Sequence, residues 1–297
     1  MKPALATAKP VAAGAALAAL LLGATCIALS PIFVRVSEVG PIATAFWRVA
    51  LAVPALWLLV PLARPGAVAT PHSVPWPLLL AAGFAFAGDL VFWHTSITLT
   101  SVANSTLLAN LASIFVTLAV WIFWRQRPSG LFLVGLCAAL AGVGMLVRSS
   151  LQFSPTALSG DAFGVVTAMF YAGYILAVKG LRDRGAKTLY LMAVTTSITA
   201  VFLYPVALAS GEALLPHSAM GWLKLAGLAL VSHAAGQGLI AYALAHLPAA
   251  FSSVSLLFQP VMAGVFAWVL LGEPLVALQV AGGVVVLIGI WLARRGS

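Results

Sequence analysis

The sequence has 297 residues, of which 63% are hydrophobic and only 7% are charged. Soluble domains carry about 25% charged residues, so this composition excludes an ordinary soluble protein and predicts a protein of the lipid bilayer. The net charge of +9 does not indicate a nucleic-acid partner, because Lys and Arg collect in the cytoplasmic loops of membrane proteins.

Ten membrane-spanning helices are expected in chain order. One crossing needs roughly 20 apolar residues, and runs of this kind are separated here by proline, glycine or charged residues. The first run follows Lys2 and Lys9 and resembles a signal peptide, but its length favours a retained helix. The predicted spans are 11–31, 42–62, 76–97, 102–124, 130–148, 159–180, 188–209, 221–243, 249–271 and 276–293.

The positive charges predict how the chain is oriented. Of the 15 Lys and Arg residues, eleven fall on the side of the two termini, three fall on the opposite side and one, Arg48, falls within a span. Positively charged loops stay in the cytoplasm, so we expect cytoplasmic N- and C-termini. The fold class is therefore an all-α polytopic membrane protein, and we expect a multi-pass protein of the bacterial inner (plasma) membrane.

The two halves of the sequence resemble each other. When residues 100–124 are laid over 249–271, Thr106 falls on Ser255 and Asn110 falls on Gln259. Each half contains five spans, an odd number, so the copies would cross the membrane in opposite directions. We expect an N-terminal repeat at 1–150 and an inverted C-terminal repeat at 151–297, joined in one transmembrane domain. Transporters use this architecture and hold substrate near the midplane.

LTSVANSTLLANLASIFVTLAVWIFWRQRP and LPAAFSSVSLLFQPVMAGVFAWVLLGEPL both resemble the repeat signature of EamA-type transporters, in the drug/metabolite transporter superfamily. GPIATAFWRVALA resembles the second helix of that family, including its arginine, here Arg48. The resemblance implies ten helices in two inverted halves, and export of small metabolites, often amino acids and in some members aromatic compounds. Two departures stand out: the first repeat ends in RQRP, and the seventh span has no arginine opposite Arg48.

Helical spacing predicts which side chains face a cavity. Polar residues recur at steps of three and four in the fourth and ninth spans, which places them on one face of each helix. Such stripes either line a wet surface or form hydrogen bonds between helices. Aromatic rings and amides in the third, sixth and eighth spans suit an amphipathic substrate that bears an ammonium group. The candidate cavity residues are Phe86, Asp89, Trp93, Asn110, Ser113, Tyr171, Tyr174, His233, Gln237, Tyr242, Ser255 and Gln259.

Asp89 lies within a span, where a charge costs roughly 2.5–3.5 kcal/mol on insertion scales. Arg48 lies at a similar depth, so an Arg48–Asp89 ion pair is one hypothesis, and it would either tie two helices together or serve transport. Pro260 frees a backbone carbonyl in the ninth span, and is either a hinge or a packing kink.

The predicted function is export of small amphipathic metabolites, most of all amino acids, by alternating access to a central cavity between the repeats. The alternative is a proton-coupled multidrug pump for lipophilic cations, although the first span lacks a carboxylate. An enzyme is not expected, because no HExxH, Ser–His–Asp or paired-carboxylate pattern occurs. Cys26 and Cys137 match no metal spacing, so we expect no metal or other cofactor. The expected partners are the substrate and the lipid bilayer; a monomer and a dimer both remain open.

Overall fold

The computed structural model describes residues 10–61, 74–100, 102–148, 157–272 and 275–297, and every regular element within these ranges is a helix. Ten helical segments there are long and apolar enough to cross a membrane, which confirms the predicted number of spans. Lys2, Lys9, Arg64 and the predicted boundary at 150 between the repeats lie outside the described residues. The ten segments are Gly14–Arg35, Pro41–Leu59, Trp76–Leu99, Asn104–Trp124, Gly130–Val147, Leu158–Asp183, Thr188–Ala209, Ala219–Ala243, Ala249–Leu270 and Ala277–Arg295.

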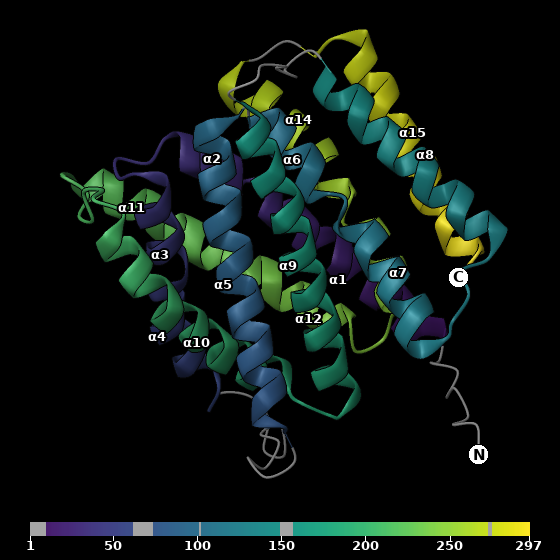
Figure 1. The fold of residues 1–297 in the computed structure, drawn as a ribbon, viewed down its shortest axis with the longest axis horizontal. Coiled ribbons are helices and arrows are strands. Elements are labelled where there is room, and N and C mark those ends of the chain that lie inside the picture. Colours follow the sequence, from purple (N-terminus) through teal and green to yellow (C-terminus); the bar gives the residue numbers. More distant parts are fainter. Residues whose placement is uncertain (1–9, 62–73, 101, 149–156, 273–274) are drawn as a thin grey trace.

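Five spans are single helices, and five are interrupted (Figure 1). The uninterrupted helices are α5 (Trp76–Leu99), α8 (Gly130–Val147), α9 (Leu158–Asp183), α10 (Thr188–Ala209) and α15 (Ala277–Arg295). The interrupted spans are α1 (Pro10–Ala28) with α2 (Ser30–Arg35), α3 (Pro41–Ala50) with α4 (Ala52–Leu59), α6 (Val102–Ala109) with α7 (Ala112–Trp124), and α13 (Ala249–Ser255) with α14 (Phe258–Leu271). The eighth span runs through α11 (Ala219–Gly227), the π-helical segment η4 (Leu228–Gln237) and α12 (Gly238–Ala243).

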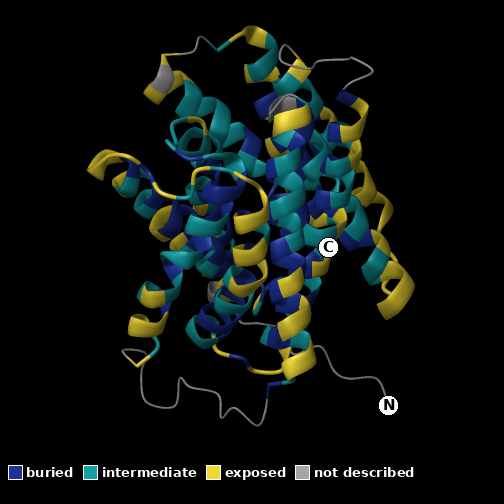
Figure 2. Ribbon diagram, turned by 60° about the vertical axis from the view of Figure 1, so that its left-hand side comes forward, coloured by how far each residue is buried: buried dark blue, intermediate teal, exposed yellow. Residues whose placement is uncertain are grey.

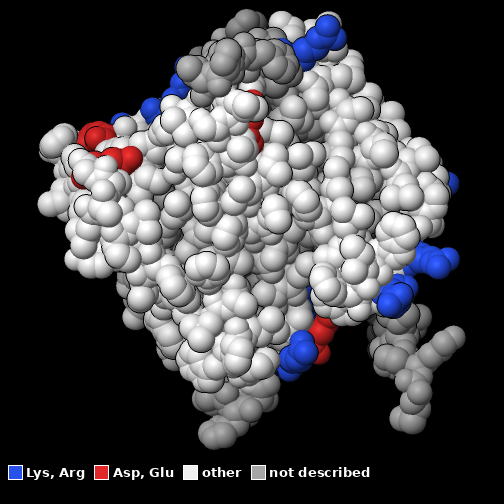
Figure 3. All heavy atoms as spheres, in the orientation of Figure 1, with Lys and Arg blue, Asp and Glu red and all other residues white. Residues whose placement is uncertain are grey.

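The outer surface of the bundle is apolar. Large hydrophobic side chains such as Leu58, Phe123 and Val201 are more than two-thirds exposed, and Figure 2 shows exposed residues along the outward faces of the helices. In Figure 3 the charged side chains lie around the rim, while the centre of the face is uncharged. This distribution matches the solvent that the composition predicted, because lipid surrounds the middle of the bundle and water its ends.

Helices α8 and α15 form a closely packed pair at one edge of the bundle (Figure 1). Their contact depends on glycines: a Cβ atom on Gly142 would lie 2.7 Å from the carbonyl oxygen of Gly282, and one on Gly289 would lie 2.7 Å from that of Gly135. Small residues let helix backbones approach closely in membranes, where lipid supplies no hydrophobic drive for helix association.

Two glutamates join distant helices at the end of the bundle that we predict to face outward. Glu38 accepts hydrogen bonds from the Ser218 hydroxyl (2.5 Å) and from the backbone amides of His217 and Ser218 (both 3.1 Å), at the start of α11. Glu212 accepts from the Ala43 amide (2.8 Å) at the start of α3. Both carboxylates thus satisfy free amides at helix N-termini. The hydrogen bond from the Ser218 hydroxyl is the main cause that lowers the pKa of the partly exposed Glu38 carboxyl.

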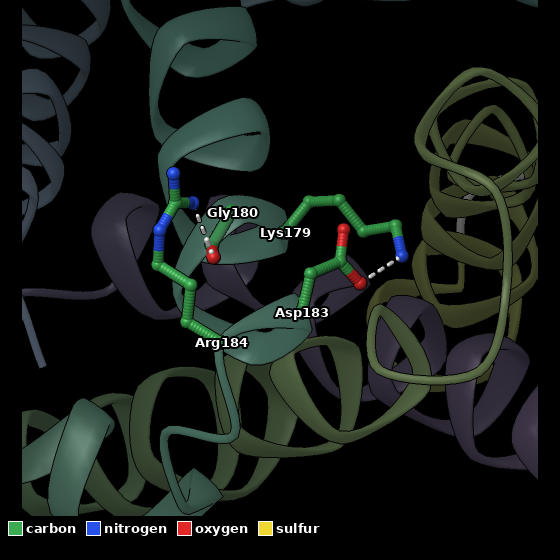
Figure 4. A network of polar contacts seen from close by, with 4 residues as sticks. All are labelled: Lys179, Gly180, Asp183 and Arg184. Atoms are coloured by element: carbon green, nitrogen blue, oxygen red, sulfur yellow. Dashed lines mark hydrogen bonds and ion pairs between the residues drawn. The ribbon is translucent and has the colours of Figure 1, made fainter. Parts of the chain in front are cut away.

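At the opposite end, α9 continues to Asp183, three residues past the predicted end of the sixth span at 180. Charged side chains stabilise the last helical turn (Figure 4): Lys179 pairs with Asp183 at 2.5 Å, and Arg184 donates to the Gly180 carbonyl at 2.9 Å. Cationic side chains near a helix C-terminus also interact favourably with its dipole.

Candidate functional site

A cavity of about 120 Å³ lies near the middle of the bundle. Its lining comes from both halves of the sequence, through α1, α2, α3, α5, α6, α9, η4 and α14. The lining residues are Ile27, Ala28, Ser30, Pro31, Arg48, Asp89, Leu90, Trp93, Thr106, Ala109, Asn110, Thr167, Tyr171, Gln237, Gln259, Pro260 and Ala263.

Interrupted helices supply many of the polar groups in this lining. Asn110 lies in the break between α6 and α7. Its side-chain amide nitrogen donates to the backbone carbonyl of Thr106 at 2.8 Å, and its backbone carbonyl accepts from the Ser113 hydroxyl at 3.0 Å. Pro260 lacks the N–H that would reach Leu256, and the ninth span breaks at 256–257, one turn earlier. Gln237 ends the π-helical segment, a wide turn that recurs at functional sites.

Eight of the residues singled out from the sequence line this cavity. Asp89 and Trp93 lie one turn apart on α5, as their spacing indicated, and Gln237 is 2% exposed. The eight are Arg48, Asp89, Trp93, Asn110, Tyr171, Gln237, Gln259 and Pro260.

Arg48 and Asp89 both face the cavity but do not form the direct ion pair that their depth suggested. Among the described residues, the ion pair within 4.0 Å is Lys179–Asp183. Arg48 is 5% exposed, and its guanidinium carbon lies 6.0 Å from the centre of the Phe86 ring. Asp89 remains within electrostatic range of Arg48. The cavity wall therefore carries a guanidinium and a carboxyl group that do not contact each other directly.

Several buried polar atoms on the cavity have no hydrogen-bond partner among the residues that the structure describes. Because an unsatisfied buried polar group costs about 1–3 kcal/mol, such atoms indicate where water or a ligand binds. They are Ser30 Oγ, Arg48 Nε, Thr167 Oγ1, the Tyr171 hydroxyl and Gln237 Oε1.

Three predicted residues pack behind the cavity wall instead of lining it. The Phe86 ring lies 4.7 Å from the ring of Tyr174 and 5.2 Å from that of His233. Tyr174 donates to the sulfur of Met192 at 3.9 Å, and His233 Nε2 lies 2.9 Å from the Thr196 hydroxyl. All five side chains are buried, so this cluster supports the wall under Arg48.

The remaining three predicted residues lie elsewhere. The Ser113 and Ser255 hydroxyls are buried and bond to backbone carbonyls of their own spans, Ser255 with Phe251 at 2.9 Å. Tyr242 is 40% exposed, and its ring lies 5.1 Å from the ring of His246. These three side chains do not appear on the cavity.

Other residues line the cavity that the sequence analysis did not predict, and helical spacing points to two of them. Thr167 lies four residues before Tyr171 on α9, so the same spacing rule points to it. Ala263 follows Gln259 by four on α14 in the same way. Ser30 was missed because the first span contains no charged or aromatic residue that marks a face.

Ten membrane-spanning helices around a polar, charged cavity define a multi-pass transport protein. The profile of the EamA-like transporter family matches residues 14–148 and again residues 158–295. The chain therefore belongs to the EamA-like transporter family, whose members are transporters and not enzymes, and it is a multi-pass protein of the bacterial inner membrane.

Relatives and a solved structure agree with this assignment. The chain is 27% identical over 217 residues to the pseudopaline exporter CntI of Pseudomonas aeruginosa, which covers 71% of this chain and 72% of the relative. It is also 27% identical over 230 residues to a probable amino-acid metabolite efflux pump of Salmonella typhimurium, covering 74% and 77%. A crystal structure with 16% identity superposes with a TM-score of 0.80 over 97% of this chain and 99% of that chain, and shows the same fold.

Proposed function

We propose that this protein exports small zwitterionic metabolites, above all amino acids, from the cytoplasm. One relative is named a pseudopaline exporter and the other a probable amino-acid metabolite efflux pump, and both names support the direction of transport.

The observation that carries this proposal is that a guanidinium, Arg48, and a carboxyl group, Asp89, line one cavity without forming a direct ion pair. An amino acid bears a carboxylate and an ammonium on the same carbon, and the Arg48 guanidinium would bind the carboxylate through charge-assisted hydrogen bonds. The ammonium would bind Asp89, with the faces of Trp93 and Tyr171 attracting the cation further. The amides of Gln237 and Gln259 would then orient the bound group.

A lipophilic cation fits this cavity less well than a zwitterion. Arg48 is buried on the lining and would repel a second cation in a medium where charges are screened weakly. A substrate with a carboxylate removes that penalty, and it also supplies acceptors for the unsatisfied Arg48 Nε–H and the Tyr171 hydroxyl.

The transport cycle would be alternating access between inverted repeats. The family profile matches once in each half of the chain, and five spans fall in each half, which supports repeats at 1–150 and 151–297 with opposite directions. Both termini would then be cytoplasmic. The fourth and ninth spans are both interrupted near cavity residues, so the breaks at Asn110 and before Pro260 would serve as hinges.

The test is uptake of labelled amino acids into proteoliposomes that contain the purified protein, with and without a pH gradient. We expect saturable uptake of at least one amino acid, and its loss in Arg48→Gln and Asp89→Asn. Arg184→Gln removes a charge at the exposed end of α9 and should transport like the wild type. Accumulation of a cationic dye while every amino acid fails would refute the proposal.

A further inference from the structure

A second cavity adjoins the polar one and has fewer polar lining residues. Its volume is about 380 Å³, and its lining includes Ile32, Ile97 and Ala267. Arg35 is the one charged group among the lining residues, all of which the structure describes. The second cavity is therefore apolar over most of its wall, and we call it the apolar pocket.

The two cavities adjoin each other. Ala28, Pro31, Trp93 and Ala263 line both of them. A molecule held at Arg48 and Asp89 would therefore reach the apolar pocket past Trp93, which lies on the boundary between the two cavities.

On two helices, the lining residues change from polar to apolar from the first cavity to the second. On α5, Asp89 lines the polar cavity, Trp93 lines both and Ile97 lines the apolar pocket. On α14, Gln259, Ala263 and Ala267 repeat the same order. Each step is four residues, or about 6 Å along a helix, which is close to the reach of a large amino-acid side chain.

We propose that the apolar pocket binds the side chain of the transported amino acid and selects bulky apolar substrates, resting on the proposed function above. The head group occupies the polar cavity, and a leucine or phenylalanine side chain leaves water for the wall formed by Ile97, Ala263 and Ala267. Alanine and serine fill only the polar cavity. Wild-type protein should bind leucine or phenylalanine about tenfold more tightly than alanine.

A larger side chain on α14 would fill the apolar pocket and test this proposal. Ala267→Phe should weaken competition by leucine and phenylalanine about tenfold in proteoliposome uptake, while alanine and serine compete within about twofold of wild type. Ile97→Ser makes the pocket polar without overpacking and should act in the same direction, so it serves if Ala267→Phe does not fold. Ala281→Phe adds the same ring on the exposed face of α15 and should leave every substrate unchanged.

The outcomes separate the two proposals. Failure of wild-type protein to transport any amino acid removes the proposed function. If the wild type transports amino acids but these variants leave bulky and small substrates equally affected, or both unaffected, the pocket is not a side-chain subsite. Loss of a copurifying phospholipid in Ala267→Phe, with unchanged leucine transport, would show a lipid chain in the pocket and also overturn the inference.

Discussion

Replacing Gly142 with alanine would test how closely α8 and α15 must pack. The new Cβ atom would lie 2.7 Å from the Gly282 carbonyl oxygen and 2.7 Å from the Val286 amide nitrogen, whereas ordinary contact begins at 3.4 Å. Both neighbours are backbone atoms of a helix, so the helices would separate by about 0.7 Å. A gap of this size forfeits roughly a quarter to a half of the contact energy of the facing atoms.

The expected cost is about 1–3 kcal/mol, in the range of overpacked cores, partly offset by up to about 1 kcal/mol from the better helix propensity of alanine. In detergent, the midpoint of thermal unfolding should fall by about 3–6 °C. Gly144 is the matched control on the same helix, because a Cβ there meets nothing within 4 Å. Gly144→Ala should unfold at the wild-type temperature or above. Equal stability of the two variants would refute the close-packing argument.

Three further changes test the ends and the wall of the site. Glu38→Gln should lower thermal stability at neutral pH, and its difference from wild type should vanish as the pH falls below about 4.5, because the folded-state pKa of Glu38 is lowered and its contribution is lost on protonation. Thr196→Val leaves a buried His233 nitrogen unsatisfied and should destabilise by about 1–3 kcal/mol in the same thermal assay. In a background without native cysteines, an impermeant maleimide added outside cells should label Leu215→Cys and not Lys187→Cys; the reverse would invert the proposed orientation.

The sequence determined the number of spans and the family because both depend on local properties. A run of about 20 apolar residues must cross the bilayer as a helix whatever its neighbours do. Within the uninterrupted α5, spacing also predicted that Asp89 and Trp93 share a face, although Phe86, predicted on the same face, packs behind the cavity wall. Asp89 and Trp93 on the uninterrupted α5 accordingly line one cavity.

Only the tertiary structure decided which predicted residues share the cavity. Faces were assigned by regular helical periodicity, but the π-helical segment and the breaks in the fourth and ninth spans change the rotation of every later residue about its axis. Gln237 therefore faces the cavity while His233, one turn earlier, packs on Phe86. Whether Arg48 and Asp89 touch was equally undetermined, because equal depth in two helices fixes neither their separation nor the direction of their side chains. Those quantities come from how the ten helices pack, which no single stretch of sequence encodes.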